Sequence, residues 1–172
     1  MKPSPEKRPI LKPALTKADY ILEAIAILAI VSVWILPLLL FHNLPDTIPT
    51  HYKINGEADG WGSKTSIFIL PAISLVLVTG LGILNKFPHI FNYPVRVTAD
   101  NALQLYCKGT RLIRIVKVMI SLLFLFIEWL ICNTGGNAKL PGWLLPVILI
   151  IPAALPIVMA LILFNNPPPR KS

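Results

Sequence analysis

The sequence predicts an all-α integral membrane protein with four transmembrane helices, a short motif-bearing outer loop and an amphipathic cytoplasmic helix before the third span. Three observations predict this fold class. Of the 172 residues, 55% are hydrophobic and 14% are charged, whereas a soluble domain carries about 25% charged residues. Four apolar runs are each long enough to cross a hydrocarbon core, which takes about 20 residues. The basic residues gather in alternate connections between these runs, as in multi-pass proteins.

The apolar runs define the domain organisation. They occupy residues 21–41, 67–84, 115–132 and 143–164. The first run is too long for a signal-peptide core and has no small-residue cleavage site after it, so we expect an uncleaved anchor. Five parts follow from this division: a disordered basic cytoplasmic tail (1–19), the first two spans (20–85) with an outer loop (42–66), a cytoplasmic connection (86–114), the last two spans (115–164) and a short cytoplasmic tail (165–172).

The distribution of positive charge predicts the orientation. The net charge is +8, and twelve basic residues lie in the two tails and the connection between spans two and three. The other two connections hold Lys53, Lys64 and Lys139. By the positive-inside rule, both termini are cytoplasmic in a cell-membrane protein and the 42–66 loop faces outward. Because this topology already accounts for the basic residues, no nucleic-acid partner is predicted.

The connection at 86–114 predicts an amphipathic helix that runs into span three. Thr98 has the chemistry of an N-cap. Leu103, Tyr106, Thr110 and Ile113 then fall on one stripe, while Lys108, Arg111 and Arg114 lie elsewhere. We expect the basic face to lie near anionic lipid headgroups.

The outer loop contains HYKINGEADGWGSK, residues 51–64. Asn55, Glu57 and Asp59 alternate as oxygen ligands do in a calcium loop, and Gly60 follows. However, Ser66 occupies the position that requires a bidentate glutamate, and His51 has no second histidine or cysteine at ligand spacing. The sequence therefore predicts no metal site.

Turn chemistry explains the glycines of this loop. Asn55-Gly56 predicts a hairpin, because both residues can take a positive φ, and Asp59-Gly60 offers a second turn. Ser63 is expected to cap the second span. His51, Glu57 and Asp59 remain without a structural reason. We treat these three, together with Asn55 and Lys64, as hypothetical ligand-binding residues.

Three charged residues lie within the spans, where charge is costly and often functional. Glu23 and Lys117 lie near the cytoplasmic ends of spans one and three, and they either snorkel or pair with each other. Glu128 lies one turn from the outer end of span three. It is expected either at the interface or facing the bundle. No serine, cysteine or histidine has a partner for nucleophilic catalysis, and no phosphate loop follows a strand. Neither an enzyme nor a cofactor is therefore predicted.

A family resemblance covers the outer loop. LPDTIPTHYKINGEADGWGSK, residues 44–64, followed by IFILPAI, resembles the membrane family called domain of unknown function 1648. The family pattern LP-x-x-IP-x-H-x-x-x-x-G-x-x-DG-x-GSK is filled here by Pro45, Ile48, Pro49, His51, Gly56, Asp59, Gly60, Gly62, Ser63 and Lys64. Pro45, Pro49, Gly56, Gly60, Gly62 and Ser63 are interpreted as the structural part of this motif.

The best-understood relatives are the SdpI-like proteins of bacteria, which protect a cell from its own secreted peptide toxin and hold a transcriptional repressor at the membrane. The resemblance implies an outward-facing motif. It also implies a secreted peptide and a cytoplasmic regulator as partners, in addition to the lipid bilayer. This chain departs from those relatives because no second SdpI-type domain follows. The alternative is a small transporter in which Glu128 and the proline-containing fourth span line a path. The sequence leaves the ligand and the oligomeric state open.

Overall fold

The structure is a computed structural model that describes residues 8–134 and 139–165. Its elements are α1 (Lys17–Leu40), η1 (Phe41–Asn43), β1 (Thr47–Tyr52), β2 (Ala58–Ser63), η2 (Lys64–Phe68), α2 (Ile69–Leu84), η3 (Pro88–Ile90), α3 (Ala102–Thr134) and α4 (Leu144–Asn165). Within the described residues, four helical segments are long and apolar enough to cross a membrane. The predicted helical, multi-pass architecture is therefore confirmed in outline.

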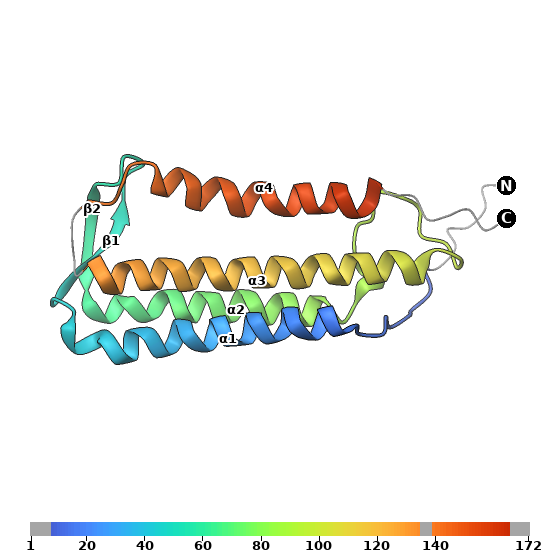
Figure 1. Cartoon of the computed structure of the whole chain (residues 1–172), viewed down its shortest axis with the longest axis horizontal. Helices are drawn as coiled ribbons and strands as arrows, with labels where there is room; N and C mark the ends of the chain where they lie inside the picture. Colours follow the sequence, from blue (N-terminus) through green and yellow to red (C-terminus); the bar gives the residue numbers. More distant parts are fainter. Residues whose placement is uncertain (1–7, 135–138, 166–172) are drawn as a thin grey trace.

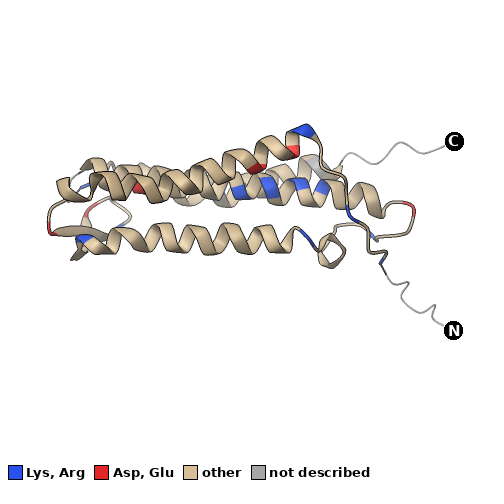
Figure 2. Cartoon of the chain, turned by 90° about the horizontal axis from the view of Figure 1, so that it is seen from below, with Lys and Arg blue, Asp and Glu red and all other residues tan. Residues whose placement is uncertain are grey.

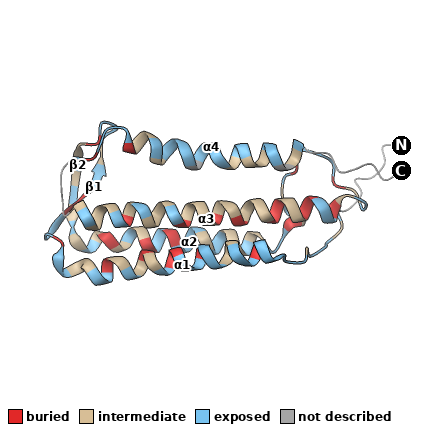
Figure 3. Cartoon of the chain, viewed as in Figure 1, coloured by how far each residue is buried: buried red, intermediate tan, exposed pale blue. Residues whose placement is uncertain are grey.

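Three of the helices form a bundle, and the fourth stands beside it (Figure 1). α1, α2 and α3 lie side by side, whereas α4 runs along α3 and is exposed over most of its length (Figure 3). Large apolar side chains such as Leu39 and Val76 are exposed on the outside of the bundle. Such a surface suits lipid chains, which cover apolar side chains without cost.

α4 is held at its two ends. Leu144, at its first turn, is buried. Near its last turn, the Phe164 ring lies 6.1 Å from the Tyr93 ring. Tyr93 belongs to a buried cluster with Val97, Ala102, Leu105 and Tyr106, which we call the distal cluster because it lies at the end of the bundle opposite the strands.

The segment before α1 is packed and not free. Its Arg8 guanidinium donates hydrogen bonds to the carbonyls of His89 and Phe91, and the Tyr106 hydroxyl donates to the Pro9 carbonyl at 2.9 Å. The prediction of a disordered tail over 1–19 thus differs from the structure at residues 8–19, and residues 1–7 lie outside the described part. Composition alone could not reveal these contacts, because their partners are more than 80 residues away.

α1 begins with a capping box. The Thr16 hydroxyl accepts from the Asp19 amide, and the Asp19 carboxylate accepts from the Thr16 amide at 2.8 Å. Two helix donors are satisfied in this way. The box also fixes the Asp19 carboxylate beside α3, which matters for the charged residues of the bundle.

α3 runs unbroken from Ala102 for 33 residues. Its first turns differ in detail from the predicted amphipathic stripe: Tyr106 and Thr110 are buried, but Leu103 is half exposed. The buried face includes Gly109 instead, because a Cβ there would lie 2.8 Å from the Tyr93 hydroxyl. Glycine therefore lets the 91–93 segment lie directly against α3.

The other end of the bundle carries a two-stranded antiparallel sheet, β1 with β2 (Figure 1). This hairpin is absent from the all-α fold class that the composition predicts, although the Asn55-Gly56 signal indicated it. α1 begins and α4 ends at the opposite, distal end (Figure 1).

Candidate functional site

The hairpin turn depends on Gly56. Its amide donates to the Lys53 carbonyl at 2.8 Å, and the Lys53 amide donates to the Glu57 carbonyl at 2.8 Å. Among the described residues, Gly56 alone has a positive φ, of 85°. The predicted hairpin is therefore present, but of the two residues that could take a positive φ only Gly56 does. The hydrogen bonds are those of a longer hairpin loop that closes on a left-handed glycine.

Asn55 contributes to the turn through its side chain. Its Oδ1 accepts from the Glu57 amide at 3.1 Å, and its Nδ2 donates to a Glu57 carboxylate oxygen at 3.1 Å. Such local side-chain bonds stabilise a turn without a left-handed backbone at the asparagine itself.

The tip of the hairpin is joined to the connection between α3 and α4. The Leu140 amide donates to the Gly56 carbonyl at 2.7 Å, and Glu57 pairs with Lys139 both as a β-bridge and through their side chains at 3.2 Å. A Cβ on Gly56 would lie 2.2 Å from the Leu140 carbonyl oxygen. Gly56 thus serves both the turn and this close approach.

Glu57 is stabilised in its ionised form. Hydrogen bonds from Asn55 and then from Lys139 lower the pKa of the Glu57 carboxyl group. Asn55 belongs to the hairpin tip and Lys139 to the connection between α3 and α4, so the Glu57 charge is half exposed and paired from both sides.

The remaining motif glycines are required by close packing, not by a second turn. Gly60 and Gly62 both lie within β2, so the predicted Asp59-Gly60 turn was wrong. A Cβ on Gly60 would lie 2.9 Å from the His51 Cβ, and one on Gly62 would lie 2.9 Å from the Thr50 methyl group. The strand register is irregular around Thr50, and that irregularity brings these side chains against the facing glycines.

The five hypothetical ligand-binding residues do not form one cluster. His51 and Asp59 pair across the strands, Asn55 and Glu57 pair at the tip, and Lys64 pairs with Asp46 at 3.0 Å at the base of the hairpin. In residues 8–134 and 139–165, no group of three or more His, Cys, Asp or Glu side chains could hold a metal ion.

The structural residues of the motif place the hairpin on the helices. Pro49 is buried within β1 and Pro45 is exposed before it. The Ser63 hydroxyl accepts from the Thr65 amide and caps η2, which leads into α2. Leu44, Ile48 and Ile67 form a second buried cluster, packed against Ile131 and Cys132 of α3 and against Phe41 and Phe68. We call this the hairpin cluster.

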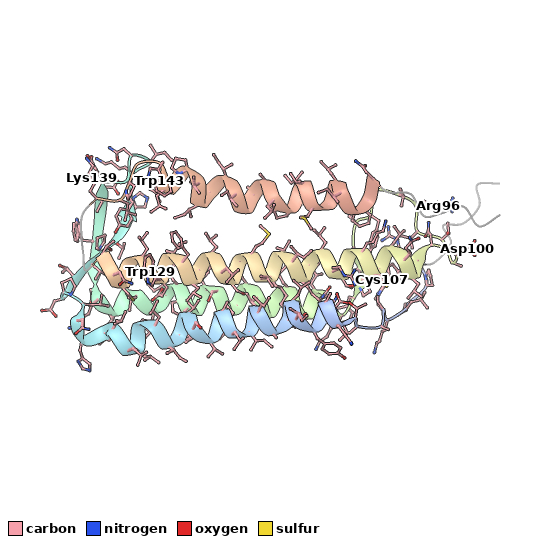
Figure 4. All side chains as sticks on the ribbon, viewed as in Figure 1. Arg96, Asp100, Cys107, Trp129, Lys139 and Trp143 are labelled. Atoms are coloured by element: carbon pink, nitrogen blue, oxygen red, sulfur yellow. The ribbon has the colours of Figure 1, made fainter. Side chains whose placement is uncertain are left out.

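An apolar cavity of about 250 Å³ lies beneath the hairpin. It is bordered by β1, η2 and α2 on one side and by α3 and α4 on the other. Six of its lining side chains are Ile48, Tyr52, Leu70, Ile131, Leu140 and Leu145. Burial raises the pKa of the Tyr52 hydroxyl. The sequence analysis missed this cavity, because its walls come from segments distant in sequence. Trp129 and Trp143 lie at the same end (Figure 4), where amphipathic rings suit a membrane interface.

A ladder of ion pairs joins α1 to α3 toward the distal end. Lys117 donates to Glu23 at 2.6 Å, so the predicted pairing of these two residues is confirmed. Arg114 lies 3.3 Å from Glu23 and 3.4 Å from Asp19. Arg111 also lies 3.3 Å from Asp19. Figure 2 shows blue and red segments gathered toward the end of the bundle at which the N-terminus lies. Arg111 and Arg114 therefore face the acidic residues of α1. They do not form the exposed basic face that was predicted to lie near anionic headgroups.

Glu128 faces the interior of the bundle. Its side chain is 0% exposed, and neither carboxylate oxygen has a hydrogen-bond partner among the described residues. Of the two placements expected for Glu128, the interfacial one was wrong. A heptad spacing could have indicated the burial: Arg114, Ser121 and Glu128 are seven residues apart, and all three are buried. Residues seven positions apart lie on the same face of a helix, so this spacing places all three on the face that is turned inward.

The fold and this site define a small multi-pass helical membrane protein with a hairpin packed on one end of its bundle. Residues 28–75, which run from the middle of α1 into α2, match the family described as "Domain of unknown function (DUF1648)", so this part of the chain is similar to that family. The chain is also 27% identical, over 157 residues, to an "Uncharacterized protein" of Archaeoglobus fulgidus, with 83% of this chain and 85% of that protein covered. No solved structure matches the chain.

Proposed function

We propose that the hairpin end binds a peptide or envelope ligand, and that the protein acts as a receptor or immunity protein and not as an enzyme. The observation that carries this proposal is the apolar cavity roofed by the family motif. The motif residues pack the hairpin above the cavity, and a preformed apolar cavity with a few polar groups is the usual form of a ligand site. The resemblance to SdpI-like proteins favours the same class of ligand.

The chemistry of the site favours an amphipathic peptide. The cavity walls would take an apolar side chain, while the His51–Asp59 and Glu57–Lys139 pairs stand exposed on the hairpin. These pairs carry both signs of charge, so they would contact the polar part of a peptide without requiring a net charge on it. Burial of the apolar part would supply most of the affinity.

A cavity-filling variant tests this proposal. Leu145 lines the cavity at the start of α4, and Leu145→Trp is expected to abolish retention of secreted peptides on the immobilised, detergent-purified protein. Leu149→Trp is the matched control, because Leu149 lies one turn further along α4 and is exposed. The peptides are fractionated from the culture supernatant of the native host and identified by mass spectrometry.

A peptide retained by the native protein and by Leu149→Trp, but not by Leu145→Trp, would support the proposal. Equal retention by all three proteins would contradict it, because binding would then not involve the cavity.

We propose further that the hairpin faces the outside of the cell membrane, with both termini in the cytoplasm. The asymmetry of the basic residues supports this orientation. In a background with Cys107 and Cys132 replaced by alanine, Lys53→Cys is expected to react with an impermeant thiol reagent on intact cells. Lys7→Cys is expected to react only after lysis. The reverse pattern would refute the orientation.

The second candidate function is transport, and Glu128 is the observation that favours it. An ionisable side chain buried in a membrane bundle often marks a path for protons or other cations. The two candidates differ in the role of Glu128. A transporter requires an ionisable group at this position, whereas a receptor at the hairpin end does not.

A further inference from the structure

A polar cavity of about 230 Å³ lies at the distal end of the bundle, away from the hairpin. Three segments form its walls: the stretch before α1, the end of α2 with η3, and the first third of α3. The lining residues are Lys12, Pro13, Asn85, Lys86, Pro88, Thr110 and Arg114. None of the seven is acidic, so the wall itself carries only positive charge.

Two of the three cations in this wall have no acidic partner in the described part of the chain. Lys12 and Lys86 are exposed at the rim, and neither makes an ion pair with a described residue. Arg114 lies at the base and is only 9% exposed. An anion in the cavity would therefore meet three positive charges without displacing an existing pair at the rim.

The charge at the base is not fully neutralised either. In the α1–α3 ladder, three bases (Arg111, Arg114 and Lys117) face two acids (Asp19 and Glu23). The ladder therefore has one more base than acid, and its buried bases are Arg114 and Lys117. Salt screens buried charges less than exposed ones. The extra positive charge of the ladder would therefore attract an anion in the cavity.

Two of the lining residues, Asn85 and Arg114, each also have a buried polar atom without a hydrogen-bond partner. Asn85 Oδ1 and Arg114 Nε have no hydrogen-bond partner among the described residues; Arg114 Nε lies 3.3 Å from Glu23, an ion-pair contact only. Buried polar atoms in proteins are normally satisfied. Asn85 and Arg114 therefore each have a hydrogen-bonding atom that the described residues do not satisfy.

The position of the cavity favours a lipid as the source of such an anion. Asn85 and Lys86 directly follow α2, and Lys12 lies five residues before α1, so the cavity lies where two candidate spans end. Ile83, Phe87 and Ile90, which lie within two residues of the lining residues Asn85, Lys86 and Pro88 in the sequence, are exposed apolar side chains. Lipid phosphates lie at this level, and their acyl chains would cover such side chains.

We propose that this cavity binds the phosphate group of an anionic membrane lipid, with Lys12 and Lys86 at the rim and Arg114 at the base. The site would hold the segment before α1, the end of α2 and α3 together around one headgroup. The proposal is independent of any ligand at the hairpin end.

The test uses the full chain in nanodiscs of equimolar phosphatidylcholine and phosphatidylglycerol. The lipid that remains bound after transfer to detergent is quantified by mass spectrometry. We expect phosphatidylglycerol to be retained over phosphatidylcholine, and Lys12→Gln/Lys86→Gln to reduce this preference by about tenfold, since each basic residue near a headgroup contributes measurably to its binding. Lys17→Gln/Arg96→Gln is the matched control, because it removes two exposed charges at the same end outside the cavity.

Retention of the preference within about twofold by the control variant, together with its loss in Lys12→Gln/Lys86→Gln, supports the site. An equal loss in both variants would overturn it, because the preference would then come from general surface charge. A second arm adds inorganic phosphate to the detergent-solubilised protein. Displacement of the retained lipid by phosphate would assign the cavity to a free phosphate and overturn the lipid assignment.

Discussion

Asp19→Asn is expected to lower the free energy of unfolding by about 3–5 kcal/mol, the range found when one partner of a buried ion pair is removed. Asp19 is 4% exposed. Its carboxylate accepts from the Thr16 amide and hydroxyl and pairs with Arg111 and Arg114. The amide would leave the buried Arg114 facing a single acid, Glu23, which Lys117 already shares.

The measurement is reversible unfolding of the purified protein in mixed micelles with increasing denaturing detergent. Asp100→Asn is the matched control, since Asp100 is exposed near the start of α3 and surface changes are usually within about 0.5 kcal/mol. Similar unfolding curves for the two variants would refute the importance of the buried ladder. Arg111→Gln, alone and combined with Asp19→Asn, would then separate the ion pair from the loss of the capping box.

Glu128→Leu is expected to raise the free energy of unfolding by about 1–3 kcal/mol. A buried polar group without hydrogen-bond partners destabilises a fold by about this amount, and leucine would replace it with an apolar side chain in the bundle. From Val118 to the end of α3, Glu128 is the one acidic or basic residue, and α2 has none. No basic side chain from these segments is therefore available to compensate the carboxyl group.

Glu57→Leu is the control for this prediction. Glu57 is exposed and paired with Asn55 and Lys139, so its replacement should give no gain in stability. A loss of stability in Glu128→Leu would contradict the interior placement of an unpartnered carboxyl group. The same variant distinguishes the two candidate functions: cation flux into proteoliposomes would be lost in a transporter, whereas peptide retention would persist in a receptor.

The sequence predicted the long elements because they depend on the bilayer and not on tertiary detail. Apolar runs at 21–41, 67–84, 115–132 and 143–164 lie within α1, α2, α3 and α4 or extend one or two residues beyond them. Their mutual arrangement could not be predicted in the same way. The position of α4 beside the bundle depends on contacts at its two ends, such as that of Phe164 with Tyr93. A local sequence pattern does not predict such contacts.

The hairpin shows both the use and the limit of turn chemistry. Asn55-Gly56 correctly indicated a turn, but only Gly56 adopts the left-handed conformation, because the Asn55 side chain instead bonds Glu57. Gly60 and Gly62 looked like turn residues, yet they face the His51 and Thr50 side chains within the sheet. Glycines at turns and glycines at close contacts are indistinguishable in a single sequence.

The intramembrane charges were predictable as a pair and not as a network. Glu23 and Lys117 lie at matching depths in two spans, which is enough to expect a contact. Asp19, Arg111 and Arg114 lie outside the predicted spans: Asp19 falls in the predicted tail, and the two arginines were expected near lipid headgroups. The capping box places Asp19 between the helices, and the unbroken α3 places Arg111 and Arg114 there. Both features are known only from the folded structure.

The unbroken α3 has a mechanical consequence. At about 1.5 Å per residue, its 33 residues span about 50 Å, well beyond the thickness of a hydrocarbon core of about 30 Å. Ile131 and Cys132 anchor one end in the hairpin cluster, and Ala102, Leu105 and Tyr106 anchor the other in the distal cluster. No proline interrupts it, so it has no joint at which a displacement could be absorbed. A tilt or rotation of α3 at the hairpin cluster would therefore be transmitted along the helix to the distal cluster.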